Sequence, residues 1–272
     1  MALTDKLTAI GDAIREKEGS TGLIALSDMP SRIQALSTGG GDDDPVRQSV
    51  LSAMNGDDWT KGTFVVPAGV NKVPRYYFYN DDTIETIMWE DETLIKKFEE
   101  GAFSGASNLK MSRFPSGFNA TEIPYICFKD CDKLQLEEGL PEGVTEIINY
   151  SFAGCSCLQF TTLPSTVTHI HPYAFEWSFS RYNTAPNPMP PELFTIPANV
   201  KVVDTNSFYG VGLKKIRFLG TPTNIDNQAF YNSTITNIYV PWMRSTVVGG
   251  VAPWGATNAT VHYEVGPDEV IA

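Results

Sequence analysis

The sequence predicts an α+β solenoid in which stacked coils follow a pair of short N-terminal helices. Two observations carry this prediction. The first 38 residues have the apolar spacing of amphipathic helices, and a phenylalanine then recurs through most of the remaining chain. The gaps between successive copies are 25, 25, 24, 23, 33 and 22 residues. The seven copies are Phe78, Phe103, Phe128, Phe152, Phe175, Phe208 and Phe230.

Residues 1–38 are predicted to form two short helices that dock onto another protein. The apolar positions at helical spacing are Leu3, Leu7, Ile10 and Ile14 in the first helix, and Met29, Ile33 and Leu36 in the second. Pro30 lies in the first turn of the second helix, where its missing N–H costs nothing. Two such helices are too short to bury both apolar faces alone, so we expect them to need a partner surface.

Residues 39–60 are predicted to be a linker and a lead-in to the coils. Three consecutive glycines remove backbone restraint, and three consecutive aspartates repel one another in any compact arrangement. A calcium loop is the alternative, but the alternating ligand pattern that such a loop requires is missing.

Residues 61–240 are predicted to form the solenoid. The position five before each phenylalanine is always apolar: Val73, Phe98, Ile123, Ile147, Ile170, Val203 and Ile225. The position two after it is Asn80, Gly105, Asp130, Gly154, Trp177, Gly210 and Asn232. Because Gly, Asn and Asp tolerate a left-handed backbone, we expect a left-handed turn in six of the seven coils, with Trp177 as the exception. One strand, one turn and one phenylalanine cannot form a core alone, so the coils must stack, with one parallel strand in each.

An insertion and a cap complete the predicted chain. Residues 177–192 contain four prolines and cannot continue the coil pattern, so we expect an outward loop. Its aromatic residues, Trp177, Phe179 and Tyr182, are the candidate ligand-binding residues, because rigid rings give large contact area at low entropic cost. The alternative is that they pack back on the coils. Residues 241–272 are predicted to be a C-terminal cap and tail, since an open solenoid end exposes core and strand edges.

Three parts of the sequence resemble known families. The segments LPEGVTEIINYSFAGC and LPSTVTHIHPYAF resemble the BspA-like bacterial leucine-rich repeat, and this resemblance covers about 180 residues. The segment LTDKLTAIGDAIREKEGSTGLIALSDMPSRIQAL resembles a module at the start of tail and minor structural proteins in phages of Gram-positive hosts. The closing segment APWGATNATVHY is similar to the end of such phage proteins. The resemblance implies a virion protein whose N-terminal module contacts a tail or baseplate protein.

We expect no catalytic centre, cofactor or bound metal. Four cysteines, Cys127, Cys131, Cys155 and Cys157, lack zinc spacing and are predicted to pack in the core as free thiols. His169 and His171 share one face of a strand, which leaves a metal pair as the alternative to a solvated face, but no third ligand is evident from the pattern. The pairs Glu99–Glu100 and Glu137–Glu138 are predicted to lie at solvated corners rather than across a glycosidase cleft.

The net charge and the hydropathy of the chain limit the classes of partner that it can bind. The net charge is -12 and the pI is about 4.7, which excludes nucleic acid because an acidic surface repels phosphates. No apolar run is long enough for a membrane span, and the first residues lack the features of a secretory signal. Host surface glycan or protein remains as a partner, and a homo-oligomer stays open.

The function predicted from the sequence is therefore a phage tail or baseplate-associated structural protein. It would be made in the bacterial host cytoplasm, be carried on the virion and mediate adhesion to the host surface. The alternative is a bacterial cell-surface or secreted leucine-rich repeat adhesin.

Overall fold

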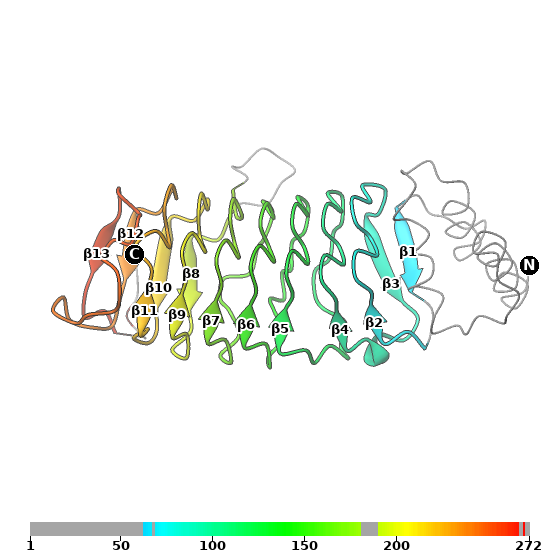
Figure 1. Ribbon diagram of the computed structural model, residues 1–272, viewed down its shortest axis with the longest axis horizontal. Helices are drawn as coiled ribbons and strands as arrows, with labels where there is room; N and C mark the ends of the chain where they lie inside the picture. The colour runs from blue at the N-terminus through cyan, green and yellow to red at the C-terminus, as the bar shows by residue number, and fades with distance from the viewer. Residues whose placement is uncertain (1–61, 67–68, 181–189, 267–268, 270–272) are drawn as a thin grey trace, which may run out of the picture.

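The computed structural model describes residues 62–66, 69–180, 190–266 and 269, which form one elongated row of coils (Figure 1). The helical content of this part is a single 3-10 turn, η1 (Glu92–Leu94), capped by the side chain of Asp91. In the described residues the fold is thus a β-solenoid of parallel strands, and the helices of the expected α+β class belong to residues 1–38. The predicted helical pair, with Leu7, Ile10, Ile14, Ile33 and Leu36, lies outside the described residues, as does the whole predicted linker and lead-in of residues 39–60.

One ladder of short parallel strands runs along the solenoid. Its strands are β2 (Lys72–Val73), β4 (Lys97–Phe98), β5 (Glu122–Ile123), β6 (Glu146–Ile147), β7 (His169–Ile170), β9 (Val202–Val203) and β11 (Asn224–Ile225). The strand β2 pairs with β4, and the other five form one sheet in the order β11-β9-β7-β6-β5. The second residue of every strand is the predicted apolar residue, and all seven are buried. The prediction of one parallel strand with a buried apolar residue before each recurring phenylalanine is confirmed.

A second ladder of parallel strands lies on another side of the coils. The sequence predicted only one strand per coil, so this ladder was not expected. Its strands are β1 (Thr63–Val66), β3 (Thr86–Trp89), β8 (Leu193–Ile196), β10 (Lys215–Phe218), β12 (Asn237–Tyr239) and β13 (Thr260–His262). The strand β1 pairs with β3, and the others form a parallel sheet in the order β13-β12-β10-β8. In β8 and β10 every second residue is buried, so each strand turns one apolar row toward the core.

The seven recurring phenylalanines form a continuous stack through the core, called here the phenylalanine ladder. Each ring is at most 2% exposed. Successive ring centroids lie 5.2–5.5 Å apart, and the first five of the six pairs are close to parallel. Because every ring contacts the one before and after it, the ladder ties each coil to its neighbours.

The turn that follows each phenylalanine is left-handed in all seven coils, including the one with Trp177, whose φ is 53°. The expectation that Trp177 departs from this turn is wrong. Along this turn column, glycine alternates with a larger residue that folds over the next coil. A Cβ added to Gly154 would meet the Asp130 Oδ1 at 2.5 Å, and one added to Gly210 would meet the Trp177 ring at 2.5 Å. The alternation is therefore required by packing between coils.

The cysteines and the last coil complete the core. All four cysteines are buried free thiols, as predicted, and the Sγ of Cys131 and of Cys155 each donate to a ladder phenylalanine carbonyl 2.9 Å away in the preceding coil. At the C-terminal end, Trp242 and Trp254 are buried with ring centroids 6.3 Å apart, and β13 extends the second ladder. No helix in the described ranges has the length and hydropathy needed to cross a bilayer.

Candidate functional site

An open groove of about 560 Å³ runs across several coils beside the left-handed turns. We call it the turn groove. Its lining residues are Asn80, Gly105, Ser107, Asp130, Asp132, Gly154, Ser156, Trp177 and Ser180. They come mainly from the positions two and four after each ladder phenylalanine, so one repeated turn supplies the whole lining. The repetition places similar groups at regular intervals along the groove, which suits a repeating ligand.

The lining of the turn groove is small, polar and partly acidic. Its glycines let the coils approach closely, and its serines and aspartates offer hydroxyl and carboxylate groups. Within it, the Ser156 hydroxyl lies 3.0 Å from the Asp132 Oδ1, which holds both side chains in place. Asp130 is exposed, so its carboxylate can accept hydrogen bonds from a ligand.

Trp177 provides the aromatic surface of the turn groove. Its side chain is 48% exposed although its backbone is fixed by a hydrogen bond of 2.8 Å from its N–H to the Tyr209 carbonyl. The indole covers Gly210 and meets the Tyr209 ring edge-on at 5.2 Å. Tyr209 in turn lies 5.8 Å from the exposed Tyr231. The ring is thus both accessible and held in one orientation, as an anchor for a ligand requires.

The structure separates the three predicted ligand-binding aromatics. Trp177 is accessible, whereas Phe179 is completely buried, so the expectation that Phe179 contacts a ligand is wrong. Its ring lies in the core, 5.4 Å from both Phe160 and Phe194. The coil therefore continues through Phe179, further than the predicted start of the insertion. Tyr182 lies outside the described residues.

Sequence reasoning missed Tyr209, Tyr231 and the two groove aspartates. Tyr209 and Tyr231 both directly follow a ladder phenylalanine, and Asp130 and Asp132 stand two and four positions after another. Alignment of the coils by offset could have shown these positions as columns. What it could not show is that the columns stand beside one another on an open face.

The pair Glu99–Glu100 forms ion pairs with basic side chains rather than a catalytic acid and base. Burial raises the pKa of Glu99, but its ion pairs with Lys72 and Lys97 outweigh this and hold the pKa below its ordinary value. Hydrogen bonding and ion pairing with Arg75 lower the pKa of Glu100 despite partial burial. A glycosidase general acid needs the opposite shift, because it must keep its proton near neutral pH.

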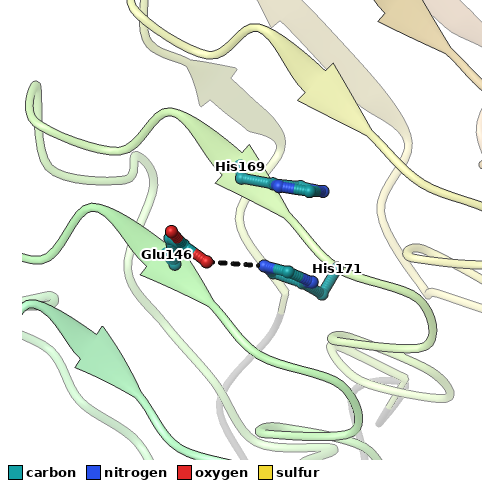
Figure 2. Close-up of side chains that lie close together, drawn as sticks. All are labelled: Glu146, His169 and His171. Carbon is teal, nitrogen blue, oxygen red and sulfur yellow. Dashed lines mark hydrogen bonds and ion pairs between the residues drawn. The ribbon is translucent and has the colours of Figure 1, made fainter.

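His169 in β7 and His171 just after it have acidic partners on the two neighbouring coils. The Nε2 of His169 lies 2.7 Å from the Asp204 Oδ2, and the Nε2 of His171 lies 2.8 Å from the Glu146 Oε2. Figure 2 shows the two imidazoles stacked above each other, with Glu146 beside them. These four residues are called here the histidine–carboxylate cluster. Glu146 lies where a third ligand to the two histidines could stand, a position that the sequence pattern did not reveal.

The repeats decide the family. The sequence pattern of the family described as "BspA type Leucine rich repeat region" matches residues 61–182 and 190–248 in six copies. These residues make up more than half of the 272-residue chain. The chain belongs to the BspA-type leucine-rich repeat family. In this leucine-rich repeat protein the matched residues include the phenylalanine ladder, the turn groove and all strands of the two strand ladders except β13.

Solved structures similar to this leucine-rich repeat protein come from several bacteria. A leucine-rich repeat protein from Bacteroides ovatus ATCC 8483 is 17% identical, with a TM-score of 0.43 over 74% of this chain and 60% of that one. A leucine rich cell surface protein from Faecalibacterium prausnitzii A2-165 is 14% identical, with a TM-score of 0.33 over 77% and 83%. The pneumococcal vaccine antigen PcpA is 14% identical, with a TM-score of 0.35 over 76% and 68%.

The chain spans 60% of the length of the Bacteroides protein. No curated protein matches it in sequence.

Proposed function

We propose that this leucine-rich repeat protein is a non-enzymatic adhesion protein that binds a neutral surface polysaccharide along the turn groove. The observation that carries the proposal is the accessible, fixed ring of Trp177 in a groove lined by hydroxyls and carboxylates. Indole faces stack on the apolar faces of sugar rings, and carboxylates and hydroxyls bind sugar hydroxyls.

The negative charge of the turn groove favours neutral surface polymers over anionic ones. Asp130 and Asp132 lie in the lining, and the whole chain has a net charge of -12. Anionic polymers such as phosphate-containing wall polymers would be repelled, whereas a neutral glycan pays no such cost. A protein ligand would have to supply cations to match the aspartates, and it would not need a regularly repeated site.

The setting we propose is the tail or baseplate of a phage that infects a Gram-positive host. This proposal is supported by the resemblance of residues 1–38 to modules of phage tail proteins, with Leu7, Ile10, Ile14, Ile33 and Leu36 as the surface for the tail partner. The groove would then hold the virion to its host. On a bacterial surface the same groove would make the chain an adhesin, which is the alternative function.

The binding proposal is tested with Trp177→Asn. Two other coils have asparagine at this position, Asn80 and Asn232, so the change keeps the left-handed turn and removes only the ring. We expect binding to neutral cell-wall polysaccharide, measured on a glycan array and by calorimetry, to weaken by about tenfold or more. Tyr125→Ala, which removes an aromatic that is 43% exposed and outside the groove, should leave binding unchanged.

Two results would contradict the proposal. Equal binding by the wild type and Trp177→Asn would remove the turn groove from the site. Binding that requires a phosphate-bearing polymer would show that the assigned ligand class is wrong.

The setting is tested separately by antibody labelling of purified virions and of uninfected cells. Label on the tail, lost when residues 1–40 are deleted, is expected. Label confined to the surface of a producing bacterium would favour the adhesin instead.

A further inference from the structure

The histidine–carboxylate cluster joins three successive coils through four side chains on one face of the solenoid. Glu146 and His169 are register partners on β6 and β7. His171 and Asp204 follow the strands β7 and β9, and their backbone N–H groups bond to Ile147 and Ile170 of the respective preceding coils. Since strand residues two apart share a face, the four side chains form an array in which the middle coil supplies both histidines and each flanking coil supplies one carboxylate.

The ligand atoms of this array are close enough to share an ion. One nitrogen of His169, one nitrogen of His171 and one oxygen of Glu146 lie within 4.8 Å of one another. Tetrahedral zinc sites place their ligand atoms roughly 3.3 Å apart, as follows from metal–ligand distances of about 2.0–2.1 Å. Closing the array onto an ion therefore requires side-chain movement. All three residues are half-buried, so an ion can reach them from solvent.

The hydrogen bond between His169 and Asp204 also favours coordination of a metal ion by His169. Its Nε2 is bonded to Asp204, which leaves Nδ1 as the nitrogen for an ion. A carboxylate that holds the second ring nitrogen of a ligating histidine fixes the tautomer and raises ligand basicity. The imidazoles lie face to face, with centroids 3.8 Å apart and planes at 15°, so their in-plane lone pairs do not converge on one point. One ring must turn about its Cβ–Cγ bond, a soft torsion, to receive an ion.

The geometry points to a binding site for a divalent transition metal, Zn²⁺ or a cation of similar preference, held by His169, His171 and Glu146 with Asp204 as a positioning residue. Imidazole ligands favour Zn²⁺, Co²⁺ and Ni²⁺ over the hard cations Mg²⁺ and Ca²⁺. The bound ion would tie the fourth coil to the fifth, which is the coil from which the insertion leaves the solenoid.

His262 is a matched control for the proposed metal site within the same chain. The Nε2 of His262 lies 2.8 Å from the Asn237 Oδ1, and its ring stacks on Tyr239 at 4.6 Å. This is also a stacked histidine on a solenoid strand with an acceptor on the neighbouring coil, but its partners are an amide and a phenol ring. His262→Ala should therefore leave metal binding unchanged.

The experiment is titration of the untagged, metal-stripped full chain with Zn²⁺ by calorimetry and with Co²⁺ by visible absorption. We expect one ion per chain, and a melting temperature raised by about 5–10 °C at a free Zn²⁺ concentration about 100 times Kd. His171→Ala should abolish the Co²⁺ spectrum, and Asp204→Asn should weaken binding by about 10–100-fold. If the alanine variant loses its cooperative melt, Glu146→Gln gives the same test at a partly exposed position.

The proposal is overturned if Zn²⁺ binding persists in His171→Ala and in Glu146→Gln, because the ion would then lie elsewhere on the acidic surface. It is equally overturned if Ca²⁺ raises the melting temperature as much as Zn²⁺ does, or if the wild type binds no ion at micromolar concentration.

Discussion

Two columns of the solenoid, two residues apart in every coil, follow opposite rules. The phenylalanine ladder keeps one side chain in all seven coils and is almost wholly buried. The turn column next to it varies from glycine to tryptophan and lines an open groove, yet its backbone is left-handed in every coil. The core column is constrained by its side chain and the turn column by its backbone. This difference leaves surface positions such as Trp177 free to acquire a binding role without loss of the fold.

The largest effect should come from the constrained side chain. Phe152→Ala removes a ring that stacks on Phe128 and Phe175 at 5.4 Å on each side, and it leaves a cavity that the coils cannot close. We expect a loss of about 3–5 kcal/mol in the free energy of unfolding, measured by denaturant titration. The exposed Tyr125→Ala should cost less than about 1 kcal/mol. Equal losses in the two variants would break the comparison between core and surface columns.

The second-largest loss in the free energy of unfolding is expected for substitutions in the turn column, which is constrained by its backbone conformation. Gly154 has a φ of 76°, and an added Cβ would lie 2.5 Å from the Asp130 Oδ1, whereas Gly143 has a φ of 101° and open space around it. Both alanine variants strain the backbone, but only Gly154→Ala also displaces a neighbour. We expect Gly154→Ala to lose about 1–3 kcal/mol and Gly143→Ala to lose less.

A double variant sharpens this prediction. Asp130→Gly removes the carboxylate from above Gly154, so it should recover part of the loss in Gly154→Ala, seen as a coupling energy in a double-mutant cycle. Additive effects would show that the alternation along the turn column is not a packing requirement.

How far the sequence predicts this structure depends on whether a feature lies within one coil or between coils. The buried strand residues, the phenylalanine ladder and six of the left-handed turns each follow from one residue type at a fixed offset. The second ladder was missed because its strands have only short alternating stretches, such as Lys215–Phe218, without the phenylalanine as a marker. Phe179 was misplaced because the buried part of the coil continues beyond Trp177, where the missing Gly, Asn or Asp marked the predicted start of the insertion.

The candidate sites are harder to predict because they join residues from several coils. The turn groove needs the columns of five coils side by side, and no single repeat contains it. The histidine–carboxylate cluster brings Glu146 and Asp204 together although 58 positions separate them in the sequence. The variable coil length, including the 33-residue gap around the insertion, hides this register until the strands are paired.

A smaller effect is expected at Trp177, where the comparison between columns is most direct. Trp177→Asn keeps a residue that tolerates a left-handed backbone, so it should change the free energy of unfolding by less than about 1 kcal/mol. Trp177→Val places a β-branched residue at a φ of 53° and should cost more, although both variants lose the same exposed ring. Thermal and denaturant melts of the two variants separate backbone strain from loss of the ring. Equal stabilities would mean that the ring, and not the backbone, constrains this position.

The smallest effect concerns Glu176, which precedes Trp177 and belongs to neither column. Burial raises its pKa above the ordinary 4.5, Lys129 opposes this shift and Asp130 adds to it. A carboxyl group whose pKa is raised by folding stabilises the protein below its unfolded pKa, and that contribution is lost as pH rises through the folded pKa. Glu176→Gln, which is neutral at every pH, should therefore raise the melting temperature at pH 7, and the gain should disappear near pH 4. The gain at pH 7 should grow in a Lys129→Ala background and shrink in an Asp130→Asn background, because these neighbours act in opposite directions on the same carboxylate. A gain that stayed constant between pH 4 and pH 7 would show that side-chain packing, and not ionisation, explains the effect.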